Sequence, residues 1–253
     1  MSIYDDGTYL KRHPSWHQED SPYKEALVLR AVRRAGLAFE SLVDVGCGAG
    51  EVTHRLARRF PTARCTGCDV SKDLADAWRR HPPLPNLTFR LEAVESLEPG
   101  FDLVLCLDVF EHVEDYLGFL RTLLAKGRRF VFNVPLDLNV AQLTTGGLSR
   151  LRRDVGHLHY FSKATALETL RHCGYEVTDW FYGHALFRVP PRNLRQVAGV
   201  LPRVALSVLG PGLRQALVGG SSLVVVASSG SGDPVGADRS RVATGPATGG
   251  PKE

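Results

Sequence analysis

The sequence lacks any stretch of about twenty apolar residues without proline or charge, the length that a membrane-spanning helix needs. Its start, MSIYDDGTYLKRHPSW, also lacks the apolar core of a secretory signal. Neither charge sign dominates, because 31 basic residues face 27 acidic ones for a formal net charge of +4. We therefore expect a cytoplasmic protein without a stable membrane span, although peripheral contact with a membrane surface stays open.

Cysteine is scarce, and its pattern does not form a zinc cluster. The chain has five cysteines, of which Cys65 and Cys68 form a CxxC with no second CxxC to complete a site. Both lie in a predicted strand, where residues three apart point to opposite faces. We interpret all five as reduced thiols. Arginine pairs are scattered along the chain rather than gathered on one segment, which favours solvated surface over a nucleic-acid track.

The order of the predicted elements indicates a parallel sheet. Buried-type strands alternate with amphipathic helices from SLVDVG (41–46) to RRFVFNVP (128–135), and a further helix spans 23–36. The pattern predicts one of these helices over 71–81 with Ser71 as N-cap, another over 114–127 closed by Gly127, and a long loop with short helical pieces over 136–160. Such alternation is typical of an α/β fold with helices on both sheet faces. We divide the chain into an N-terminal segment and helix (1–37), a main domain (38–229) with inserts at about 136–160 and 185–220, and a tail (230–253) whose composition predicts disorder.

Three glycines follow the first strand at alternate positions, in SLVDVGCGAGEVTHRLARRF (41–60). They leave room for a ligand beside the start of a helix, and Asp69 ends the second strand, where a carboxylate accepts the two hydroxyls of a ribose. The alternative is a tight turn without a ligand. The spacing G-x-G-x-G departs from the dinucleotide pattern G-x-G-x-x-G, and Asp44 before the loop would repel a pyrophosphate. These features favour a nucleoside with a cationic group over NAD.

At this point the sequence resembles the class I S-adenosylmethionine-dependent methyltransferases. The resemblance covers about residues 40–182 and rests on VDVGCGAG, CDVS, LEAVESL and FDLVLCLDVFEHV. It implies S-adenosyl-L-methionine as cofactor and a Rossmann-like, seven-stranded, mostly parallel sheet whose last strand is antiparallel, with YEVTDWFY and SSLVVVAS as the sixth and seventh strands. It also implies the cofactor contacts. These are Asp44, Gly46, Cys47, Gly48 and Gly50 with Leu107 for the methionine part, Asp69 for the ribose, and Val70, Glu92 and Ala93 for the adenine.

Two histidine-bearing segments should open on the same sheet edge: DVFEHVED, with Asp108, Glu111 and His112, and GHLHYF, with His157 and His159. Three interpretations compete. In the first, Glu111 and His112 only brace a loop, as in many metal-free members of the family. In the second, His112, His157 or His159 takes a proton from a hydroxyl acceptor. In the third, ranked last, Asp108, Glu111, His112 and His157 hold a divalent metal, since the segments resemble the E-x-x-E-H plus histidine arrangement of ubiquinone-pathway O-methyltransferases and small-RNA 2′-O-methyltransferases.

The N-terminal WHQEDSPYKEA resembles a segment found in a subset of bacterial class I methyltransferases. An ordinary helix entry explains Ser21 as N-cap and Pro22 at the first helical position. It leaves Trp16 and His17 without a role, so we expect them to form a lid near the methionine end of the cofactor.

The two inserts are where we expect the acceptor to be selected. The second is apolar with arginines at intervals, and LSRLRRD near residue 150 adds positive charge. Together they favour an acidic, phosphate-bearing, glycan-linked or lipid-linked acceptor, methylated at oxygen. The alternatives are an RNA 2′-O-methyltransferase and a non-catalytic partner protein that binds the cofactor.

Overall fold

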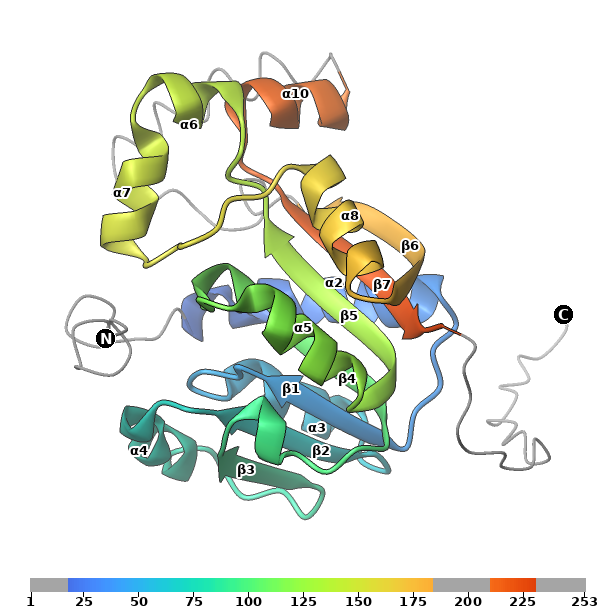
Figure 1. Ribbon diagram of the computed structural model, residues 1–253. Helices are drawn as coiled ribbons and strands as arrows, with labels where there is room; N and C mark the ends of the chain where they lie inside the picture. Colours follow the sequence, from blue (N-terminus) through green and yellow to red (C-terminus); the bar gives the residue numbers. More distant parts are fainter. Residues whose placement is uncertain (1–17, 184–209, 231–253) are drawn as a thin grey trace, which may run out of the picture.

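The computed structural model describes residues 18–183 and 210–230 (Figure 1). Seven strands form one sheet in the order β3-β2-β1-β4-β5-β7-β6. All pairs from β3 to β5 are parallel, and β7 is antiparallel to both of its neighbours. The expected α/β fold with an antiparallel last strand is confirmed. The strands are β1 (Ser41–Val45), β2 (Arg64–Asp69), β3 (Leu87–Leu91), β4 (Phe101–Leu107), β5 (Gly127–Pro135), β6 (Tyr175–Gly183) and β7 (Ser222–Ser229).

Helices cover both faces of the sheet, which explains why its central strands are largely buried and mostly apolar. On one face, α2 (Ser21–Arg34) and α3 (Glu51–Arg59) pack on a buried cluster that includes Cys65. On the other, α5 (Tyr116–Leu124) and α8 (Lys163–His172) pack on a cluster that includes Cys68. The two cysteines therefore lie on opposite faces, as predicted, and all five cysteines are free thiols.

Several helix ends follow from local chemistry. Ser162 caps α8 with the reciprocal bonds of a capping box to Thr165. Asp115 caps α5 by accepting the N–H of Gly118. Gly127, expected to close α5, instead begins β5, where a Cβ would collide with the Val104 side chain.

The helix expected over 71–81 is broken into η2 (Lys72–Leu74) and α4 (Ala75–Arg79), and Ser71 does not cap it through its side chain. The backbone N–H of Ser71 is instead donated to Asp69. Ser21, expected as the N-cap of α2, is the first helical residue, and Asp20 takes the cap position.

A group of short helices lies beyond the carboxyl end of β5 (Figure 1). It consists of α6 (Val140–Thr144), α7 (Gly147–Asp154) and α10 (Pro211–Val218). The expected loop with helical pieces after β5 thus corresponds to α6 and α7. The remaining short elements are η1 (Gln18–Asp20), η3 (Val94–Ser96) and η4 (Phe110–His112).

Some sequence predictions fall outside the described residues. They are the lid residues Trp16 and His17, most of the insert at 185–220, and the tail after residue 230. None of the helices within 18–183 and 210–230 is long and apolar enough to cross a membrane.

Candidate active site

The glycine loop joins β1 to α3 at the carboxyl edge of the sheet. Gly46, Gly48 and Gly50 all have positive φ, at 73°, 54° and 80°. A Cβ at Gly50 would collide with the Phe89 ring, so this glycine permits close packing. A Cβ at Gly48 would meet nothing within 4 Å. The backbone at Gly48 therefore faces open space, as a close approach by a ligand requires.

The loop has few free backbone donors. Phosphate-binding loops aim their N–H groups at the ligand. Here four N–H groups are donated within the protein: those of Gly46 and Cys47 to Cys68 O, that of Gly48 to Asp69 Oδ2, and that of Gly50 to Cys47 O. This pattern argues against a pyrophosphate, in agreement with the reading of the sequence that disfavoured NAD.

The side chains of Trp78 and His81 support the glycine loop, and the sequence analysis did not predict these contacts. The Trp78 indole Nε1–H donates to Gly48 O at 2.8 Å, and its ring stacks on Phe89 with centroids 5.3 Å apart. His81 Nε2 lies 2.7 Å from Ala49 O. Because a carbonyl only accepts, the proton is on this nitrogen of His81. The sequence signal was the aromatic content of the segment after Asp69.

Two carboxylates flank the loop. Asp44 is 2% exposed and accepts the Thr53 hydroxyl at 2.7 Å. Burial raises the pKa of Asp44 to about 6, against the opposing hydrogen bond from Thr53 and the charge of Lys24. Burial also raises the pKa of Asp69, although N–H groups of Ser71 and Gly48 donate to its two oxygens. Each oxygen of Asp69 keeps a lone pair that could accept a ribose hydroxyl.

The residues predicted for the adenine lie where β2 and β3 end. Glu92 donates its backbone N–H to Asp69 O, which joins the two strand ends. Val70 is 61% exposed, leaving an apolar surface beside Asp69, and Ala93 is half-buried next to Glu92. Leu107, predicted beside the methionine part, ends β4 and is buried in the cluster under α3.

Glu111, His112 and His157 come together at the ends of β4 and β5. One ligand atom from each lies within 4.8 Å of the others. Glu111 is completely buried, and neither carboxylate oxygen has a hydrogen-bond partner among the described residues. Burial raises the pKa of Glu111 well above its usual value, and the charge of Asp108 adds to the rise.

His112 is an uncharged member of this cluster. Its Nδ1 lies 3.2 Å from Gly156 O and therefore carries the proton, while Nε2 lies 3.9 Å from Glu111 Oε1. Burial lowers the pKa of His112 to about 4, and the nearby His157 adds to the effect.

His157 is held by Asp137, a residue that sequence reasoning missed. Its Nδ1 lies 2.5 Å from Asp137 Oδ2, so Nδ1 carries the proton and Nε2 is left as an acceptor. Asp137 lies two residues beyond the end of β5, and the two rings of His157 and His112 meet edge to face at 4.8 Å. The only sequence signal was an acidic residue just after a strand at the active edge.

Two other predicted residues lie apart from the cluster. His159 Nε2 lies 2.9 Å from Val113 O, and its ring centroid is 4.3 Å from that of Tyr116. Asp108 pairs with Lys24 at 2.7 Å and accepts the Asn133 amide at 2.7 Å. The structure thus brings together three of the four predicted metal ligands.

The donor set fits a divalent ion of the Zn²⁺ or Mn²⁺ kind. It offers one carboxylate without internal partners and two imidazoles, each with Nδ1 fixed by an outer oxygen, which is the usual arrangement around metal-binding histidines. With three ligands, positions remain for an acceptor.

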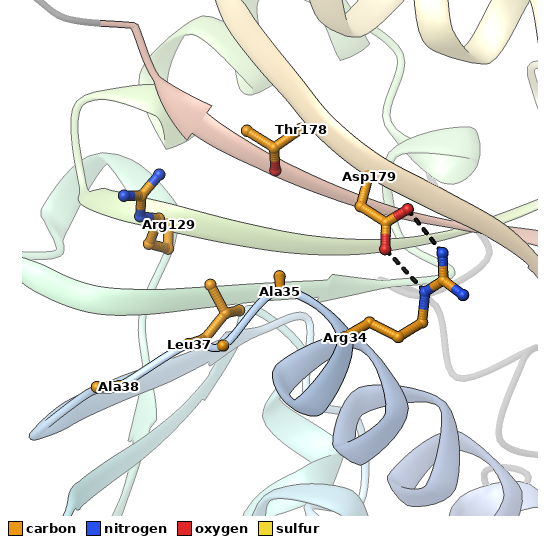
Figure 2. A pocket seen from close by; sticks show the side chains of 8 residues that line it. Arg34, Ala35, Leu37, Ala38, Arg129, Thr178 and Asp179 are labelled. Atoms are coloured by element: carbon orange, nitrogen blue, oxygen red, sulfur yellow. Dashed lines mark hydrogen bonds and ion pairs between the residues drawn. The ribbon is translucent and has the colours of Figure 1, made fainter.

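A separate hollow of about 610 Å³ lies near the amino ends of β1 and β5 (Figure 2). Arg34 and Asp179 form a two-pronged ion pair there, at 2.8 and 2.9 Å, which ties α2 to β6. None of the predicted site residues lines this hollow.

Comparison with known proteins places the chain among methyltransferases. The family described as "Methyltransferase domain" matches residues 15–179. A ubiquinone biosynthesis O-methyltransferase of Xanthomonas campestris is 33% identical over 118 residues. That match spans 42% of this chain and about half, 48%, of the relative. A protein of the same name from Xanthomonas euvesicatoria is 30% identical over 186 residues, which cover 65% of this chain and 77% of the relative.

Among solved structures, magnesium protoporphyrin IX methyltransferase from Synechocystis PCC 6803 with bound SAH has the same fold. The TM-score is 0.53 at 18% identity, over 84% of this chain and 83% of the other.

Proposed function

The chain belongs to the S-adenosylmethionine-dependent methyltransferases of class I, and we propose that it methylates an oxygen atom of a small molecule or of a glycan- or lipid-linked precursor. The observation that carries this proposal is the pairing of His157 with Asp137 beside Glu111 and His112. Oxygen is also the atom named in the relatives from Xanthomonas.

His157 is the proposed general base. An acceptor hydroxyl attacks the methyl carbon, its proton passes to Nε2 of His157, and the carbon–sulfur bond breaks so that the cofactor leaves as the neutral thioether. Asp137 keeps the proton on Nδ1 and stabilises the imidazolium that forms. A charged sulfonium is a good leaving group, so the main task of the protein is to align the two reactants and exclude water.

A divalent ion would be held by Glu111, His112 and His157. Bound there, it would lower the pKa of a hydroxyl that coordinates it. Chelation distinguishes the two routes. The protein is purified, its metal content is measured, and methyl transfer is assayed with and without excess chelator. Full activity in excess chelator would exclude the metal-dependent route and support the general-base route.

The elements beyond β5 support the proposed acceptor class. Val140 and Leu143 on α6 are 50% and 58% exposed, and α7 carries Arg150, Arg152 and Arg153. Apolar and basic side chains next to one another suit an acceptor that combines an apolar part with an acidic group.

The proposal is tested with radiolabelled S-adenosylmethionine. Extracts of a strain lacking the gene supply unmethylated acceptor, and extracts of the parent strain are the control. We expect label in a lipid- or glycan-containing fraction of the deletion strain only, and mass spectrometry then locates the methyl group. Label at nitrogen or carbon contradicts the proposal, and label in the RNA fraction favours the 2′-O-methyltransferase alternative.

A further inference from the structure

Lys24 brings a positive charge to the acidic edge of the sheet. It belongs to α2, and its Nζ lies 2.7 Å from Asp108 Oδ2. The two side chains are 25% and 26% exposed, so a ligand in the site can reach them. Among the described residues, Lys24 is the basic side chain whose charge acts on both Asp44 and Glu111.

Lys24 is charged at neutral pH. Burial alone would lower the pKa of its ammonium, but the hydrogen bond and charge of Asp108, with the charges of Glu111 and Asp44, raise the pKa above its usual value. Asp108 is the carboxylate that compensates this charge most directly, because its Oδ2 lies 2.7 Å from Nζ.

Asp108 is fixed in an unfavourable backbone conformation. Its φ is 59°, and it is the described non-glycine residue with positive φ. This conformation costs about 1 kcal/mol. Asn133 on β5 holds it twice, by donating its amide to Asp108 Oδ1 at 2.7 Å and by accepting the Asp108 N–H at 2.9 Å. The other oxygen, Oδ2, is thereby directed at Lys24.

The ammonium of Lys24 therefore lies near the point where the glycine loop meets the end of β4. Gly46 and the segment after Asp108 pack against one another there, because a Cβ on Gly46 would be 2.6 Å from the Val109 side chain. The resemblance to the family assigns this region to the methionine part of the cofactor, which carries an ammonium and a carboxylate beside the sulfonium.

The glycine loop offers few donors to the carboxylate of that amino acid. The N–H groups of Gly46, Cys47, Gly48 and Gly50 are already donated within the protein. Asp44 suits the ammonium of the cofactor and would repel its carboxylate. Lys24, in contrast, has three N–H bonds. Among the ion pairs of the described residues, its ammonium has one acidic partner at hydrogen-bond distance, which is Asp108.

We propose that Lys24 binds the carboxylate of the cofactor, and that Asp108 acts as a positioning residue for its ammonium. This inference rests on the proposed function only in its use of S-adenosylmethionine. It assigns to Lys24 the selection of cofactor forms that keep the carboxylate, and it makes α2 part of the cofactor site.

The test compares two ligands that differ in the carboxylate alone. S-adenosylhomocysteine and its decarboxylated form are titrated into the full chain by calorimetry, for the wild type, Lys24→Met and Lys24→Arg. The double variant Lys24→Met/Asp108→Asn removes the ion pair without leaving the Asp108 carboxylate unpaired. Arg33→Met, which removes an exposed charge from the same helix, is the matched control. Circular dichroism and melting temperature verify that each variant is folded.

We expect Lys24→Met and the double variant to bind S-adenosylhomocysteine about tenfold or more weakly than wild type, which is the range of a charge-assisted hydrogen bond. Their affinity for the decarboxylated form should equal that of wild type. Lys24→Arg should retain most of the affinity, and Arg33→Met all of it. Equal losses for both ligands would show that Lys24 is only structural and overturn the inference. A wild type that binds neither ligand would instead overturn the cofactor site itself.

Discussion

Nδ1 of His157 lies 2.5 Å from Oδ2 of Asp137, and this contact joins the beginning of the first insert to its end. Asp137 follows the end of β5, and His157 follows α7, so the pair spans the whole first insert. An imidazole fixed in one tautomer by a carboxylate is suited to take a proton at its other nitrogen.

Asp137→Asn should lower kcat by about 10²-fold or more, because the histidine loses both its fixed tautomer and the charge that stabilises its protonated form. The affinity for S-adenosylhomocysteine should stay within a factor of two of wild type, since Asp137 lies outside the residues assigned to the cofactor. Steady-state rates and calorimetry measure the two effects. Loss of cofactor binding in parallel with rate would mean that Asp137 only maintains the fold.

His157 and His159 offer a matched comparison because they lie two residues apart. His157→Gln should reduce kcat by about 10²-fold or more, the usual contribution of a general base. His159→Gln should leave the rate within a few-fold of wild type, because His159 Nε2 is occupied by Val113 O. Melting temperatures serve as the control for folding. The opposite ranking of the two rates would transfer the role of base to His159.

Gly48→Ala should abolish measurable cofactor binding at modest cost in stability. Its φ of 54° costs an alanine about 1 kcal/mol, while the new methyl group would occupy the open space in front of the loop. Gly36→Ala is the control, since Gly36 has a φ of 58° and equally open surroundings. Both variants should lose similar stability in urea unfolding, and only the first should fail to bind. Normal binding by Gly48→Ala would place the cofactor elsewhere.

Asp44→Asn should stabilise the cofactor-free protein at pH 7.5 but not at pH 4.5. The pKa of Asp44 is raised by burial from 3.8 to about 6, so its folded state favours the proton. Its contribution to stability is thus complete below about pH 4 and is lost as the pH rises through 6. The free energy of unfolding of Asp44→Asn relative to wild type should therefore change by at most about 3 kcal/mol between low and high pH. The asparagine oxygen can still accept from Thr53.

Urea unfolding of both proteins at the two pH values measures this difference directly. An equal change in unfolding free energy at both pH values would contradict the raised pKa. The same substitution should weaken cofactor binding, since Asp44 is the carboxylate placed for a cation.

The sheet was predictable because β1, β2 and β4 are short, largely apolar runs that end at or just before an acidic residue or a glycine. The positions of Asp44 and Asp69 follow directly from those endings. The meeting of His112 with His157 was also within reach, because both segments open on the carboxyl edge. The partners Lys24 and Asp137 were not, since nothing in a single sequence says which side chains of α2 or of the β5 loop point at that edge.

The errors have a common physical cause, which is tertiary contact overriding a local preference. Ser71 has the sequence context of an N-cap, but its N–H is taken by the carboxylate of Asp69. Gly127 has the sequence context of a helix stop, but it begins β5, where a side chain would collide with Val104. His157 and His159 are indistinguishable by pattern, and the carbonyl of Val113 separates them.

Gly183 and Ser222 are directly opposite one another in the antiparallel ladder of β6 and β7. The second insert therefore departs from and rejoins the sheet at neighbouring backbone positions. Its length can change without pulling the two strands apart, so relatives could exchange this region as a cassette. Such changes would leave the loops after β1, β2 and β3 in place, because these strands lie on the far side of β4 and β5 from the insert.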